Sequence, residues 1–280
     1  MKPLEILSSL EPWRSLDAAA VVDSPAWAVP CRLGDEQAAM RRASVRPADT
    51  LGLAVRFGDE PHALSIAPSP RFPELSRLWG VRCEVPEPIL LALVERECAP
   101  LFQLLENAVR KQLTVDGLGG EPAESDLCAE VGGIVFTLTR SPTVVAALGQ
   151  LRNLDPSHPE IREAPCAAEC EYAAFALDPA SAASLAPGDA VVAPELETAV
   201  PRLVVEGAIV LSDGETSPLP EDPLCHVRAA AATTVRLGEL FDGSAAVPPA
   251  ATPLRLVVSG RTVASCRLDR LASQPALIVE

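Results

Sequence analysis

Short apolar runs separated by turn residues make up most of the hydrophobic pattern, and one such run occurs twice. Residues 202–210 read Arg-Leu-Val-Val-Glu-Gly-Ala-Ile-Val, and residues 255–263 read Arg-Leu-Val-Val-Ser-Gly-Arg-Thr-Val. Six of the nine positions are identical, at a spacing of 53 residues (from 202 to 255). Similarity at a fixed spacing is typical of a duplicated structural unit. The C-terminal third is therefore predicted to hold two copies of one small unit.

Each copy is predicted to be a β-hairpin, because its first strand is a run of residues that suit a pleated, half-buried surface. These strand residues are Leu203, Val204, Val205, Leu256, Val257 and Val258. Gly207 and Gly260 occupy the turns, where glycine adopts a positive φ without a Cβ clash. A lone hairpin is marginal in water, so each copy needs a partner, and we expect that partner to be the other copy. Pro201 and Pro253 precede the two copies, which counts against chance similarity of two valine-rich strands.

A short apolar segment with a glycine lies ahead of each hairpin. Residues 185–192 read Leu-Ala-Pro-Gly-Asp-Ala-Val-Val, and residues 235–243 read Val-Arg-Leu-Gly-Glu-Leu-Phe-Asp-Gly. We expect each segment to form a short strand joined to a turn. The positions singled out here are Leu185, Gly188, Leu237 and Leu240.

The first half of the chain has a mixed α/β pattern. Alternating apolar residues predict a hairpin over 51–67, with a Gly-Asp turn. Residues 85–113 predict two amphipathic helices divided at Pro100, since proline breaks a helix interior. A strand is expected at 134–139, and a short helix at 142–154 that starts with a Ser-Pro pair. Residues 1–30 have no clear period.

Proline-rich polar stretches mark the expected linkers at residues 155–165 and 213–223. The domain prediction is an N-terminal α/β domain over 1–154, a first module over 166–212 and a second over 224–280. The expected fold class is α+β: a mixed α/β domain followed by two small β-rich modules that pair with each other.

Composition and charge narrow the classes of function. Of 280 residues, 28 are proline, which favours short elements, and 48% are hydrophobic, which permits a packed core. The net charge is −15 and no basic cluster exceeds two residues, so nucleic acid is not an expected partner. No apolar run has the length of a membrane span or of a secretory leader, so we expect a cytoplasmic protein.

Candidate chemistry is sparse. The eight cysteines lie among apolar neighbours, as small buried residues do in a reducing compartment. The best metal-like spacing is Cys166 and Cys170 with His158 nearby, but a second close pair is missing. We find no nucleophile elbow, phosphate-binding lysine loop or zinc-protease helix. We expect no catalytic residues, no metal and no cofactor.

These pieces resemble the type III secretion C-ring, or sorting-platform, proteins (the YscQ/HrcQ/SpaO family), which are similar to flagellar motor switch proteins. The resemblance rests on two C-terminal modules of the SpoA kind, and it covers about 115 residues well. The second module has Leu-Gly-Glu-Leu at 237–240 and Leu-Val-Val-Ser-Gly at 256–260. The first has Pro-Gly-Asp at 187–189 and Leu-Val-Val-Glu-Gly at 203–207. Each module keeps only part of the family pattern.

The resemblance implies a non-catalytic scaffold at the cytoplasmic face of the inner membrane, under the secretion base. It implies that the SpoA modules pair as an intertwined β structure, within the chain or between copies. The implied partners are the membrane-ring adaptor, the stator-like regulator of the ATPase, the ATPase complex and chaperone-bound substrates. Neither direct membrane insertion nor nucleic-acid binding is implied.

Two alternatives stay open at this point. One is a component of the flagellar switch complex, which should carry one C-terminal module and a phosphatase-like middle domain. The other is an unrelated enzyme or ligand-binding protein with a β-rich C-terminal domain. A metal or a polar pocket at Cys166, Cys170 and His158 would favour the latter.

Overall fold

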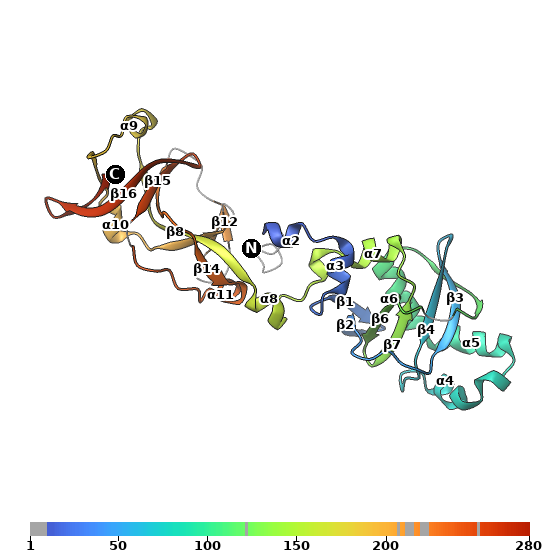
Figure 1. Ribbon diagram of the computed structural model, residues 1–280. Helices are drawn as coiled ribbons and strands as arrows, with labels where there is room; N and C mark the ends of the chain where they lie inside the picture. Colours follow the sequence, from blue (N-terminus) through green and yellow to red (C-terminus); the bar gives the residue numbers. More distant parts are fainter. Residues whose placement is uncertain (1–9, 121–122, 206–207, 211–215, 219–223, 251–252) are drawn as a thin grey trace. The chain divides into compact units, whose positions relative to one another are not determined.

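The computed structural model describes residues 10–120, 123–205, 208–210, 216–218, 224–250 and 253–280 (Figure 1). The chain divides into two compact units, each with helices and antiparallel sheet, so its class is α+β. The N-terminal unit is Ser15–Asp155. The C-terminal unit is Pro156–Glu280 together with Met1–Arg14, of which residues 10–14 are described.

The N-terminal unit contains a seven-stranded antiparallel sheet in the order β1-β2-β6-β7-β4-β3-β5. Its strands are β1 (Ala28–Leu33), β2 (Glu36–Arg42), β3 (Leu51–Phe57), β4 (Glu60–Ile66), β5 (Leu113–Leu118), β6 (Leu127–Val131) and β7 (Ile134–Leu138). Its helices are α3 (Ala18–Asp23), α4 (Pro73–Leu78), η1 (Trp79–Glu84), α5 (Glu87–Glu97), α6 (Ala99–Val109), α7 (Pro142–Leu148) and η2 (Leu151–Asn153). Helix α6 contacts β1 and β5, and its Leu101, Leu104 and Leu105 are buried.

Most of the elements expected in this unit are confirmed. Strands β3 and β4 form the expected hairpin, and the helical region divides into α5 and α6 at Cys98, just before Pro100. Ser141 caps α7, since its Oγ accepts a hydrogen bond from Val144 N at 3.3 Å. Helix α7 is shorter than expected, ending at Leu148. Strands β1 and β2 were not expected. In β1, Pro30 interrupts the sequence, and the buried positions do not alternate regularly.

The end of α7 depends on a glycine at a tight backbone contact. A Cβ on Gly149 would lie 2.1 Å from the carbonyl oxygen of Ala18. We predict that Gly149→Ala lowers the free energy of unfolding of the N-terminal unit by about 1–3 kcal/mol, the usual cost of overpacking. Urea unfolding followed by the fluorescence of buried Trp27 and Trp79 measures this. Gly80→Ala is the matched control, since nothing lies within 4 Å of its Cβ, and equal effects of the two changes would contradict the prediction.

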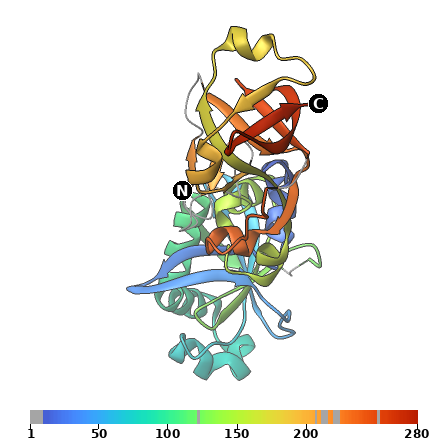
Figure 2. The ribbon, with the colours of Figure 1, turned by 90° about the vertical axis from the view of Figure 1, so that its left-hand side faces the viewer.

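The C-terminal unit contains a second antiparallel sheet, in the order β12-β11-β10-β8-β13-β15-β16-β17-β9, with β14 also paired to β8. Its strands are β8 (Pro165–Ala176), β9 (Ala190–Val192), β10 (Arg202–Val205), β11 (Ala208–Val210), β12 (Thr216–Pro218), β13 (Leu224–Ala229), β14 (Thr233–Arg236), β15 (Leu254–Val258), β16 (Arg261–Leu271) and β17 (Gln274–Val279). Its helices are α2 (Glu11–Arg14), α8 (Pro159–Glu163), α9 (Pro179–Ala183), α10 (Glu195–Thr198) and α11 (Leu237–Phe241). Figures 1 and 2 show α9 on a loop that stands off from this sheet.

Both repeated segments are hairpins, as the sequence predicts. Strand β10 pairs with β11, and β15 pairs with β16. Ser259 and Gly260 form the second turn, with φ of 49° and 73°, which matches the twist of a two-residue hairpin loop. Gly207 lies outside the described residues. The expectation that the two hairpins pair with each other is wrong: β10 pairs with β8 and β15 pairs with β13, so two strands separate them.

The structure also differs from the expected boundaries. Residues 155–165 contain α8, whose Ile161 is buried, and the 213–223 stretch includes β12, its other residues lying outside the described ones. Residues 237–240 belong to helix α11 instead of the expected strand and turn. The segments 166–212 and 224–280 share one sheet, since β8 pairs with β13 and β14, and β9 pairs with β17.

Candidate functional site

Strand register in the C-terminal unit brings charged residues from four neighbouring strands into one row. Glu171 of β8 lies opposite Arg202 of β10 on one side and Arg228 of β13 on the other. Arg255 of β15 lies opposite Arg228. Residues directly opposite in an antiparallel pair share a face, and so do residues two apart along a strand. Glu169 therefore joins the same face as Glu171.

These five side chains form an alternating ionic chain: Arg202, Glu171, Arg228, Glu169, Arg255. Arg202 Nη2 lies 2.6 Å from Glu171 Oε1, and Arg228 Nε lies 3.2 Å from Glu171 Oε2. Arg228 Nη1 also lies 2.7 Å from Glu169 Oε2, and Glu169 Oε1 accepts a hydrogen bond from Arg255. Glu169 thus separates Arg228 from Arg255, two like charges that would repel each other when directly opposite.

His226 of β13 adds a further contact to this ionic chain. Its Nδ1 lies 3.0 Å from Glu171 Oε2, and Glu171 is only 1% exposed. Burial favours the neutral form of both glutamates, but the nearby side chains of His226 and Arg202 outweigh it, so the pKa of Glu171 lies below its ordinary value. Burial is likewise outweighed at Glu169, where Arg228 and Arg255 lower the pKa of the carboxyl. Both glutamates are therefore ionised at neutral pH.

The pairing of β8 with β13 contains an irregularity beside this chain of charges. Val227 lies opposite Ala173 and Arg228 lies opposite Glu171, so Tyr172 has no partner residue on β13. Such an extra residue, a β-bulge, re-aims a side chain. Tyr172 lines a groove of about 530 Å³, and its hydroxyl donates a hydrogen bond to Pro249 O at 3.4 Å.

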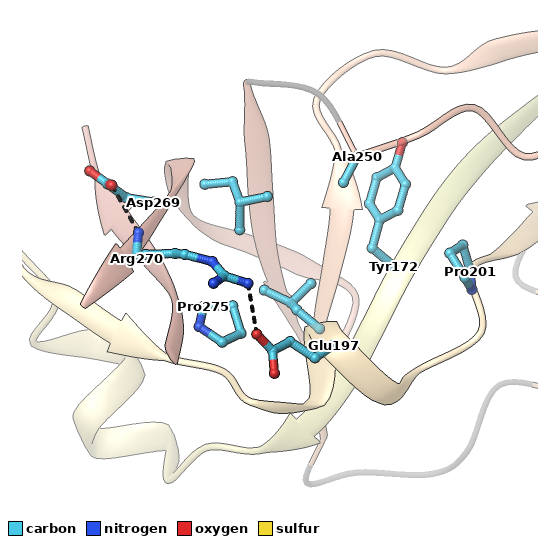
Figure 3. A pocket seen from close by; sticks show the side chains of 9 residues that line it. Tyr172, Glu197, Pro201, Ala250, Asp269, Arg270 and Pro275 are labelled. Carbon is cyan, nitrogen blue, oxygen red and sulfur yellow. Dashed lines mark hydrogen bonds and ion pairs between the residues drawn. The ribbon is translucent and has the colours of Figure 1, made fainter. Parts of the chain in front are cut away.

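The groove lies between β8, α10 and the β16–β17 hairpin (Figure 3). Its walls are mainly apolar, and Leu196 and Leu268 line it together with Tyr172. Arg270 spans one side and forms an ion pair with Glu197 at 3.0 Å. An apolar groove with charged residues at its rim suits a peptide segment of a partner protein.

The structure places the residues expected to pair the modules inside the sheet. All six apolar strand residues of the two hairpins are buried, and so are Leu237 and Leu240 of α11. Leu185 is half-buried, and Gly188 forms an exposed turn, with φ of 96°, whose N–H donates a hydrogen bond to Val279 O. These residues therefore pack within the C-terminal unit, and none of them lines the groove at Tyr172.

Sequence reasoning missed the charged residues and the groove. The first residue of each repeat was a usable signal, because Arg202 and Arg255 bind Glu171 and Glu169 respectively. The β16–β17 hairpin had no such signal. Its turn residues, Ala272 and Ser273, have φ of 49° and 73°, which Asn or Gly would ordinarily supply.

The alternative metal site receives no support from the geometry. Cys166 and Cys170 are four residues apart on β8, about 13 Å along an extended strand, too far for two ligands of one ion. His158 Nδ1 instead accepts a hydrogen bond from Glu160 N at the start of α8. Within the part of the chain that the structure describes, no three His, Cys, Asp or Glu side chains are grouped to hold a metal ion.

Comparison with known protein families and with curated proteins gave no match. Among the described helices, none is both long enough and apolar enough to cross a bilayer.

Removing Glu171 from the ionic chain should take away the carboxylate that Arg202 contacts and one of the two carboxylates that buried Arg228 contacts. We predict that Glu171→Gln lowers the stability of the β8 region by about 3 kcal/mol, the cost of breaking a buried pair. Amide hydrogen exchange of β8 in the full chain measures this. Glu197→Gln is the matched control because its pair with Arg270 is exposed, and it should cost less than about 1 kcal/mol. Equal losses in the two variants would contradict the prediction.

Acidification should weaken the same region. A carboxyl whose pKa is lower in the folded state adds stability at pH values above its unfolded pKa of about 4.5, and this stability is lost as the pH falls through the folded pKa. Exchange protection of β8, corrected for intrinsic rates, should therefore decrease between pH 6 and pH 3. The decrease should be smaller in Glu169→Gln and Glu171→Gln. A decrease of the same size in both variants would assign the acid sensitivity to other groups.

Proposed function

We propose that this protein is a non-catalytic scaffold of a type III secretion apparatus, acting in its cytoplasmic C-ring or sorting platform. It links the membrane-ring adaptor to the stator-like regulator of the ATPase and helps to receive chaperone-bound substrates. In this proposal, the C-terminal unit consists of two SpoA-type modules paired within one chain. The flagellar switch and the enzyme are the competing functions.

One observation carries the proposal: strands from the two parts of the repeat region lie in a single sheet, and β9 of the first part lies at its edge, beyond the strands of the second part. Strand β8 of the first part pairs with β13 and β14 of the second, and β9 of the first part pairs with β17 at the end of the second. The repeated hairpins lie on either side of the β8–β13 pair. This is the arrangement that intertwined pairing of two SpoA modules within a chain would require.

The groove at Tyr172 is the surface that we assign to the regulator. Leu268 is 38% exposed there, although a large apolar side chain is usually buried. An apolar residue of a partner segment would cover it and release water. The rim ion pair between Arg270 and Glu197 could then exchange with charges of the partner, which would give selectivity.

Co-purification of the tagged full chain with the stator-like regulator encoded in the same genome tests the proposal. We expect the wild-type chain to retain the regulator and Leu268→Glu to lose at least about 90% of it, because a charge would occupy an apolar groove. Val263→Glu is the matched control, since Val263 is also an exposed apolar residue of β16 but does not line the groove.

Two results would count against the proposal. Failure of the wild-type chain to retain either the regulator or the membrane-ring adaptor would reject the scaffold function. Retention by Leu268→Glu equal to that of Val263→Glu would leave the scaffold function standing and reject this groove as the site.

A further inference from the structure

Helix α5 of the N-terminal unit is apolar on two faces. Leu90 and Val94 are buried, as expected for a helix packed on a core. Ile89, however, is 59% exposed, and Ala92 and Leu93 continue the same outward stripe at helical spacing. An amphipathic surface helix would carry polar residues there. The outward stripe is therefore not explained by the fold of this unit.

Helices α4 and α5 form a groove along this stripe. They contact each other, and Leu78 of α4 faces the same space as Ile89 and Leu93 (helices in Figure 1). The groove has a volume of about 550 Å³. It is open to solvent on the described surface of the unit.

The groove is held in a fixed shape by a cap between the two helices. Phe72, the residue before α4, has no capping side chain. Glu97, the last residue of α5, takes over this role: its Oε2 accepts hydrogen bonds from Glu74 N and Leu75 N, at 3.0 Å each. A carboxylate at a helix N-terminus accepts hydrogen bonds from N–H groups that have no partner within the helix, and its negative charge interacts favourably with the helix dipole. The end of α5 thus anchors the start of α4, so a partner would meet a preformed groove and lose little entropy on binding.

Charge along the groove favours one kind of partner. Three charged residues line it, namely Arg77, Arg96 and Glu74. Arg77 is paired with Glu74 at 2.9 Å, and Arg96 lies 3.6 Å from Glu97, the carboxylate that also caps α4. Such exposed pairs contribute little stability, so carboxylates of a partner can compete for both arginines. The arginine side chains are 73% and 66% exposed. The net charge of the whole chain is −15, so most of its surface repels an acidic partner. The exposed arginines at the groove attract such a partner, and this contrast would direct it to the groove.

We propose that the α4–α5 groove binds an amphipathic helix of a partner protein, with its apolar stripe on Ile89 and Leu93 and its acidic residues beside Arg77 and Arg96. Helix α5 has 11 residues and is therefore about 16 Å long, which fits a partner helix of about three turns. Helix-in-groove recognition uses apolar anchors at i, i+3 or i+4, and i+7. This surface lies on a different unit from the Tyr172 groove, and the proposal holds whether or not the function proposed above is correct.

Fluorescence anisotropy with the full chain and two labelled helical peptides tests the proposal. Both peptides have about 15 residues and the same leucine stripe, and the flanking residues are glutamate in one and lysine in the other. We expect saturable binding of the glutamate peptide, stronger than that of the lysine peptide and weakened by salt. Ile89→Ser should weaken it about tenfold. The double variant Arg77→Glu, Arg96→Glu should reverse the preference between the peptides.

Val45→Ser is the matched control, because Val45 is an exposed apolar residue of the same unit that does not line the groove. It should leave binding unchanged, and circular dichroism checks that every variant is folded. Three results would overturn the proposal: no saturable binding, equal binding of both peptides, or a preference that the arginine reversal leaves unchanged. A fourth would be self-association of the wild-type chain that Ile89→Ser abolishes, since the occupant would then be a second copy.

Discussion

The C-terminal unit depends on the burial of a fixed row of charges in the middle of its sheet. Glu171 is almost inaccessible to water and ionised, which is tolerable only while Arg202, Arg228 and His226 surround it. A shift of β8 by one residue would turn its side chains to the opposite face and leave these charges unpaired. The ionic chain therefore favours one register for β10, β8, β13 and β15 together.

This constraint explains why two sequence-distant parts behave as one sheet. Arg202 begins the first repeat and Arg255 begins the second. Both arginines reach glutamates of β8, a strand that lies between the two hairpins in the sheet. Neither repeated hairpin can satisfy its arginine alone. Strands β9 and β17 add a second link between the two parts at the other edge. The two parts of the repeat region are therefore joined at two places in one sheet.

The accessible surfaces are distinct from the residues that assemble the fold. The hairpin valines and leucines are buried, whereas Leu268 and Ile89 are exposed beside grooves with charged rims. In both grooves the local structure fixes the shape: a β-bulge directs Tyr172 into one, and Glu97 ties α4 to α5 in the other. The chain thus has an apolar groove on each of its two units.

The sequence by itself determined the local elements of this protein. Period-2 alternation and a Gly-Asp turn specified β3 and β4, Pro100 divided α5 from α6, and the repeat located both C-terminal hairpins. These features are encoded by neighbouring residues, so one chain segment suffices to predict them. The tertiary structure decided which strands lie together, because pairing of β8 with β13 depends on the register of residues 48 to 57 apart. Only that pairing brings the charges of Glu169, Glu171 and Arg228, which are distant in the sequence, into one ionic chain. Likewise, only the folded structure shows that Leu268 and Ile89 stay exposed while the hairpin valines are buried.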